Sequence, residues 1–152
     1  MNPEETIKQE LESKFGVLKD AVVIQRPRRI FVDVPIDHFA EVFDHIVKSM
    51  NFPILPAITG LDEGATFGVM YHLGRENGQM LSLRTHIPRE KPLIKTVTDY
   101  FPSADIYERE LVDLFGINVE GLAAGPHYPL PDNWPQGQHP LRKDWKEGGS
   151  HA

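Results

Sequence analysis

The chain has 152 residues, of which 40% are hydrophobic, and its formal net charge is −6 at pH 7. This length and composition predict one folded domain with a single core, and the acidic charge argues against a general nucleic-acid or anionic-membrane binder. The absence of cysteine excludes disulfides and Cys-ligated zinc or iron–sulfur clusters, and no apolar run approaches the ~18 residues of a membrane span.

The first part of the chain predicts a helix, two strands and a second helix. Asn2 and Pro3 begin an amphipathic helix with an apolar stripe at four-residue spacing. Strands follow at 21–25 and 30–34, and the turn between them is Arg26-Pro27-Arg28-Arg29. That turn could contact an anion or RNA, but a solvated hairpin turn is the favoured interpretation in so acidic a chain. Residues 35–50 then carry the apolar stripe of a long helix.

Three more strands are predicted in the middle of the chain, at 56–61, 67–73 and 80–86, the last two joined through Asn77-Gly78. Residues 88–101 read as a connection with a short turn at 93–97. This order predicts an α+β fold, with an antiparallel or mixed sheet of about five strands and helices packed on one face.

A short charged helix is predicted from Tyr107 to Phe115, with Gly116 as the left-handed residue that ends it. Arg109 and Asp113 are four residues apart and share a face. We expect them to form an internal ion pair, which leaves Glu108 or Glu110 to contact a basic side chain of a partner.

Beyond Gly121 the composition changes. Prolines and glycines exclude regular structure there, yet five large apolar side chains are spread through the segment, far more than a disordered linker carries: Tyr128, Leu130, Trp134, Leu141 and Trp145. We therefore expect an α+β domain at 1–118 and an extended proline-rich arm at 119–152 that docks on a partner or on its own core. Residues 147–152 read as an unstructured end.

Two chemical alternatives are less favoured. Glu108, Glu110 and Asp113 could serve as acid–base catalysts in a stand-alone hydrolase or isomerase, but Arg109 is at hand to neutralise them and no nucleophile accompanies them. His127 and His139 could bind a metal ion, but they are twelve residues apart in an irregular segment. We expect no catalytic, cofactor or metal site.

Two separated motifs together resemble a known family. The first contains Glu108-Arg109-Glu110, Asp113, Phe115-Gly116 and Glu120-Gly121; the second contains Trp134 and then His139-Pro140-Leu141-Arg142-Lys143-Asp144. In this order, near the C-terminus, they are similar to the signature of the 30 kDa subunit of respiratory complex I and its counterpart in energy-converting [NiFe] hydrogenases.

The resemblance implies a cofactor-free subunit of the peripheral arm, on the cytoplasmic face of the cell membrane, that braces an oxidoreductase. It implies two partners, a large subunit of the 49 kDa, [NiFe]-hydrogenase-like type and a small iron–sulfur subunit. The residues of both motifs, Trp134 included, would then serve assembly. Residues 122–127 and the spacing between Trp134 and His139 depart from the quinone-reducing pattern. Both the quinone-reducing and the hydrogenase branches therefore stay open.

Overall fold

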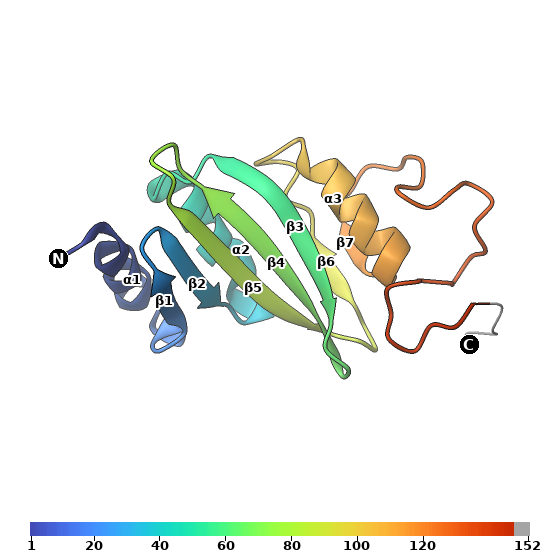
Figure 1. Ribbon diagram of the computed structural model, residues 1–152, viewed down its shortest axis with the longest axis horizontal. Helices are drawn as coiled ribbons and strands as arrows, with labels where there is room; N and C mark the ends of the chain where they lie inside the picture. The colour runs from blue at the N-terminus through green and yellow to red at the C-terminus, as the bar shows by residue number, and fades with distance from the viewer. Residues whose placement is uncertain (148–152) are drawn as a thin grey trace. The chain divides into compact units, whose positions relative to one another are not determined.

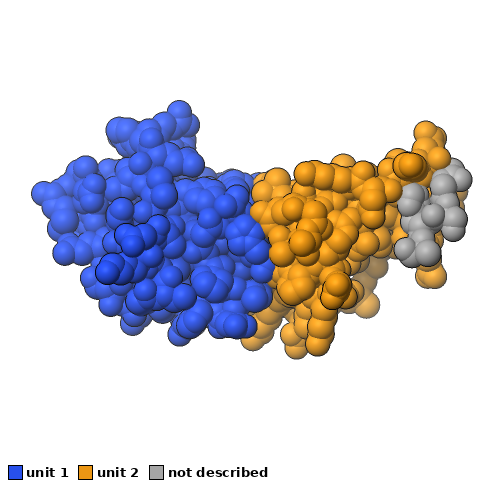
Figure 2. Space-filling view, turned by 90° about the horizontal axis from the view of Figure 1, so that it is seen from below, with its two compact units in different colours: residues 1–58, 69–86 blue, residues 59–68, 87–152 orange. Residues whose placement is uncertain are grey.

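The computed structural model describes residues 1–147. The expectation of an unstructured end at 147–152 therefore falls almost wholly outside the described residues. The described chain divides into two compact units, coloured separately in Figure 2. Unit 1 comprises Met1–Ile58 and Val69–His86, and unit 2 comprises Thr59–Gly68 and the described residues from Ile87 onward.

The strands form a five-stranded sheet in the order β1-β2-β5-β4-β3 and a two-stranded sheet of β6 and β7 (Figure 1). Their bounds are β1 Val22–Arg26, β2 Arg29–Asp33, β3 Ile54–Asp62, β4 Thr66–Gly74, β5 Met80–Pro88, β6 Leu93–Lys95 and β7 Asn118–Glu120. β1 pairs antiparallel with β2, whereas β2 pairs parallel with β5, so the larger sheet is mixed. The predicted α+β class with a mixed five-stranded sheet is confirmed.

Unit 1 contains the helices predicted before the middle strands. α1 spans Pro3–Lys14, and the side chain of Asn2 accepts a hydrogen bond of 2.8 Å from the Glu5 N–H, as an N-cap does. A 3₁₀ turn, η1, follows at Gly16–Leu18. The single helix expected at 35–50 is in fact three consecutive pieces, η2 (3₁₀, Ile36–His38), α2 (Phe39–Asp44) and η3 (π, His45–Ser49).

An aromatic cluster holds α2 against β4 in unit 1. The ring of Tyr71 lies 5.0 Å from that of Phe39 and 5.4 Å from that of Phe43, and all three residues are buried. Each such pair contributes about 0.5–1.5 kcal/mol beyond the area it buries. The inward-facing Tyr71 of β4 therefore packs on the apolar stripe of α2.

Unit 2 contains β6, β7, the helix α3 at Ala104–Glu110 and its π-helical continuation η4 at Leu111–Phe115. β6 and β7 pair in parallel, with Ile94 opposite Val119. Neither strand was expected, and the short turn predicted at 93–97 is wrong because Leu93–Lys95 is extended. No helix or strand follows Glu120 within the described residues, and the domain boundary between 118 and 119 stays a prediction.

Candidate functional site

Helix α3 and its continuation η4 organise the part of unit 2 in which the two motifs meet. The helix ends at Gly116, whose backbone lies in the left-handed region with φ of 73°, as predicted. The last carbonyl groups of any helix lack partners within the helix and need donors from elsewhere. Asp113, Leu114 and Phe115 supply these carbonyls here.

The second motif caps these three carbonyl groups. His139 Nδ1 lies 2.9 Å from the Asp113 oxygen, the Leu141 N–H donates to Leu114 over 3.0 Å, and Arg142 Nε donates to Phe115 over 2.6 Å. In Figure 1 the red C-terminal segment returns to this end of the helix. A cation such as Arg142 is also favoured at the negative end of the helix dipole. The first motif thus contains the end of a helix, and the second motif caps it. We call the cap, residues 139–144, the C-terminal latch.

Asp62, at the end of β3, holds the latch from another side. Its side chain is 2% exposed and accepts hydrogen bonds from the N–H of Lys143 (2.8 Å), the N–H of Gly64 (3.0 Å) and Arg89 Nη1 (2.7 Å). Burial by itself raises the pKa of this carboxyl, but the three donors outweigh it and lower the pKa to about 2. Arg89 also reaches Asp144 over 2.9 Å and so links β3 to the latch.

Replacing Asp62 by asparagine is expected to lower the free energy of unfolding at pH 7 by about 2 kcal/mol, because an amide cannot accept from all three donors. The contribution of Asp62 is fully present above its ordinary pKa of 3.8 and is lost as the pH falls to about 2, since its folded pKa is depressed. The loss should therefore shrink below pH 4 when melting is followed by circular dichroism. Asp144→Asn is the control: this partner of the same Arg89 is 74% exposed and should cost under about 0.5 kcal/mol. Equal losses in both variants would contradict the role of Asp62.

The ring of Phe67 packs against two arginine side chains, Arg89 and Arg142. The guanidinium carbons of Arg89 and Arg142 lie 5.0 and 5.2 Å from its ring centroid, and the ring of Phe115 meets it edge-on at 6.1 Å. Stacking on aromatic faces is a geometry that arginine adopts readily. Phe115, expected to be an assembly residue, is thus an internal packing residue under the latch.

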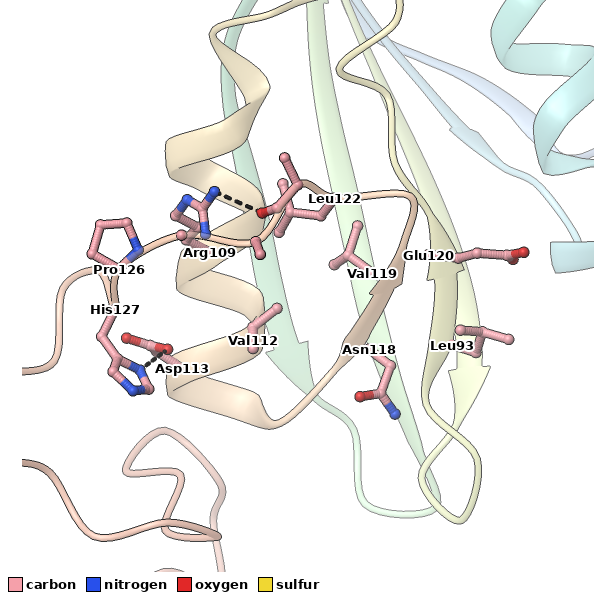
Figure 3. Close-up of a pocket in the computed structure, with 13 residues that line it drawn as sticks. Leu93, Arg109, Val112, Asp113, Asn118, Val119, Glu120, Leu122, Pro126 and His127 are labelled. Carbon is pink, nitrogen blue, oxygen red and sulfur yellow. Dashed lines mark hydrogen bonds and ion pairs between the residues drawn. The ribbon is translucent and has the colours of Figure 1, made fainter. Parts of the chain in front are cut away.

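A second set of contacts fixes the beginning of the arm on the same helix (Figure 3). Asp113 Oδ1 lies 2.9 Å from His127 Nδ1, and its other oxygen is 3.4 Å from the Leu130 N–H. The carboxylate of Asp113 raises the pKa of His127. Asp113 therefore holds the arm twice, through its side chain at His127 and through its carbonyl at His139.

Arg109 does not form the expected ion pair with Asp113. Its Nε and Nη2 atoms donate to Asp105 over 2.6 and 3.0 Å, and Nη2 also donates to the Ala123 carbonyl. Both aspartates lie four residues from Arg109, but an acid on the N-terminal side of the base is the better arrangement in a helix. His127 takes the carboxylate of Asp113 instead.

Glu108 is fully buried, so of the two carboxylates expected to be left for a partner, Glu108 or Glu110, only Glu110 is accessible. Its oxygens accept from Thr96 Oγ1 at 2.5 Å and from the Val97 N–H at 2.9 Å. Burial raises the pKa of Glu108, and these two hydrogen bonds only partly oppose the shift. Glu108 joins α3 to the segment after β6.

The remaining residues singled out by sequence lie at or near the surface of unit 2. Glu110 and Pro140 are partly exposed, and Glu120 is exposed and points away from α3 in Figure 3. Gly121 packs against Thr96, and Trp134 Nε1 donates to the Gln138 carbonyl over 2.8 Å. Asp62, Phe67, Arg89 and Thr96 belong to the site although sequence reasoning missed them, because nothing in their local pattern marks contacts so distant along the chain.

A groove of about 430 Å³ lies beside these contacts, between the helix and the segment at 122–127 (Figure 3). Its walls are mostly apolar, including Leu93, Val112, Val119 and Leu122. Within residues 1–147, no three His, Asp or Glu side chains are grouped as a metal site requires. His127 and His139 each form a hydrogen bond with Asp113 instead. None of the helices in the described part of the chain is long and apolar enough to cross a membrane.

Comparison with known proteins gives a family and several relatives. The family described as "Respiratory-chain NADH dehydrogenase, 30 Kd subunit" matches residues 32–151. The chain is 31% identical over 144 residues to a subunit of the F(420)H(2) dehydrogenase of Methanosarcina mazei, covering 93% of this chain and 90% of that protein. It is 36% identical over 132 residues to NADH-quinone oxidoreductase subunit 5 of Thermus thermophilus, covering 78% of this chain and 62% of that one.

Among solved structures, a chain of the membrane-bound sulfane sulfur reductase, an archaeal respiratory membrane complex, matches with a TM-score of 0.83. The two chains are 30% identical, and the match covers 96% of this chain and 87% of that one. The similarity therefore extends through unit 1 and unit 2 rather than being confined to the two motifs.

Proposed function

The chain belongs to the family of the 30 kDa subunit of respiratory-chain NADH dehydrogenase, and we propose that it is a structural subunit of a membrane-bound oxidoreductase related to complex I. In this role it binds no cofactor of its own and holds electron-carrying subunits in place. It sits in the peripheral arm on the cytoplasmic face of the membrane. Its partners are a large subunit of the 49 kDa, [NiFe]-hydrogenase-like type and a small iron–sulfur subunit.

One observation carries this proposal: three charged groups of the two motifs, Glu108, Asp113 and Arg142, form hydrogen bonds within the chain itself. Glu108 is buried under Thr96 and Val97, Asp113 holds His127, and Arg142 caps Phe115. Acid–base catalysis needs a carboxylate that can reach a substrate, and the carboxylate of Glu108 is fully buried. The arrangement suits a rigid scaffold whose surface binds other subunits, so the hydrolase or isomerase alternative is not favoured.

The proposal is tested by affinity purification of the tagged chain from its own host, followed by mass spectrometry of the proteins that accompany it. We expect a large hydrogenase-like subunit and a small iron–sulfur subunit at near-equal amounts. Flavin- and quinone-module subunits would assign the complex to the quinone-reducing branch, and a large subunit with four [NiFe]-ligating cysteines would assign it to the hydrogenase branch. Recovery of the chain alone would contradict the proposal.

A further inference from the structure

A second pocket lies on the outer face of α3, where the arm adds one wall. It encloses about 520 Å³ and is lined by Asp105, Ile106, Tyr107 and Glu110 from the helix and by Tyr128 from the arm. Ile106 is 49% exposed and Tyr128 is 44% exposed. Two phenol rings and an aliphatic side chain therefore stand at the surface of unit 2 around one hollow.

The two carboxylates of this pocket differ in whether they have a counter-ion. Asp105 is already paired with Arg109 at 2.6 Å. The side chain of Glu110, five residues further along the same helix, has no hydrogen-bond or ion-pair partner within residues 1–147. One carboxylate without a counter-ion thus lies at the edge of an aromatic pocket, and this combination is complementary to a flat cation that can stack on a ring while it bonds to a carboxylate.

The arm completes the pocket. Tyr128 follows His127, which is held on the helix by Asp113 at 2.9 Å. The pocket therefore exists in full only when this contact is made, so its binding is coupled to the docking of the arm. An apolar partner segment would use Ile106 and the two rings but would leave Glu110 buried without a counter-charge, which is costly.

We propose that this pocket binds an arginine side chain of a neighbouring protein subunit, with Glu110 as its counter-ion and Tyr107 and Tyr128 as its walls. The inference rests on the proposed function, because it requires a neighbouring subunit. Arginine is favoured over lysine because its planar group stacks on aromatic rings and bonds a carboxylate through two N–H groups.

The test is photo-crosslinking in the complex purified from the host, with p-benzoylphenylalanine in place of Ile106. The cross-linked partner peptide should contain an arginine. Glu110→Arg should lower the cross-link yield at least about tenfold, because the introduced cation would face the partner arginine and repel it. Replacing the partner arginine by glutamate in the Glu110→Arg background should restore the yield to within about twofold. Glu110→Gln serves as the mild variant, with an intermediate loss. Glu90→Arg is the control, since it makes the same charge change at an exposed position elsewhere on unit 2.

The outcomes separate the two proposals. A cross-linked peptide with no arginine, or no cross-link from a complex that still co-purifies, would overturn the pocket assignment and leave the proposed function standing. A peptide whose only cation is lysine would also overturn it. If no other subunit co-purifies with the unsubstituted chain, both the proposed function and this inference are overturned.

Discussion

Replacing Glu108 by alanine is expected to lower the free energy of unfolding by about 2–4 kcal/mol. Glu108 is fully buried, and the substitution leaves a cavity and removes the acceptor of the Val97 N–H and of Thr96 Oγ1. A buried donor without a partner costs about 1–3 kcal/mol by itself. Chemical denaturation at pH 7, with the midpoint and slope both measured, gives the difference directly.

Glu108→Gln is the matched control, because an amide keeps both hydrogen bonds: its oxygen accepts from Val97 and its nitrogen donates to Thr96 Oγ1. The pKa of Glu108 is raised above its ordinary value of 4.5 by burial. The stability it contributes is therefore fully present below pH 4.5 and is lost as the pH rises through the folded pKa. The glutamine variant should match the native chain at pH 4 and become the more stable of the two as the pH rises to 8. A glutamine variant as unstable as the alanine variant would show that the carboxylate is needed as a charge.

Local pattern predicts most of the elements of this fold but not all of them. The strands β2, β4 and β5 can be predicted because their buried residues alternate over five or more positions. β6 and β7 have three residues each and one buried or half-buried side chain at the centre, Ile94 or Val119, so no period exists to be detected. Their pairing joins residues 25 positions apart, and no local signal encodes that contact.

The site shows the same division between near and distant contacts. Gly116 could be predicted as the end of the helix because a left-handed residue there is a local requirement. The pairing of Arg109 with Asp105 follows the preference for an acid on the N-terminal side of the base, but the contact between Asp113 and His127, 14 residues away, has no local signal. Asp62 has no local signal at all, although its contact with Lys143 spans 81 residues and holds the latch. Sequence therefore identifies the residues of the two motifs but not the fact that they bind each other.

Replacing Gly116 by alanine is expected to release the latch. A methyl group there would lie 2.6 Å from the His139 ring and 2.7 Å from Arg142 Nη2, so both side chains must leave the carbonyls they cap. The left-handed backbone, with φ of 73°, adds strain for any residue with a Cβ. We expect a loss of about 3–5 kcal/mol in the free energy of unfolding, as strain and the lost caps combine. Trypsin should also cleave after Arg142 and Lys143 at least about tenfold faster, since local opening of the segment sets the rate of cleavage.

Gly137→Ala separates strain from contact. Gly137 has nearly the same backbone angle, φ of 77°, but a methyl group added there meets no atom within 4 Å. It therefore carries the strain of about 1–2 kcal/mol without displacing the latch. If the latch holds the end of the helix, the Gly116→Ala variant must lose more stability than the Gly137→Ala variant. Trypsin must also cleave the Gly116→Ala variant faster. Equal effects in the two variants would mean that His139 and Arg142 find other partners at no cost, and that the motif does not depend on the end of the helix for its position.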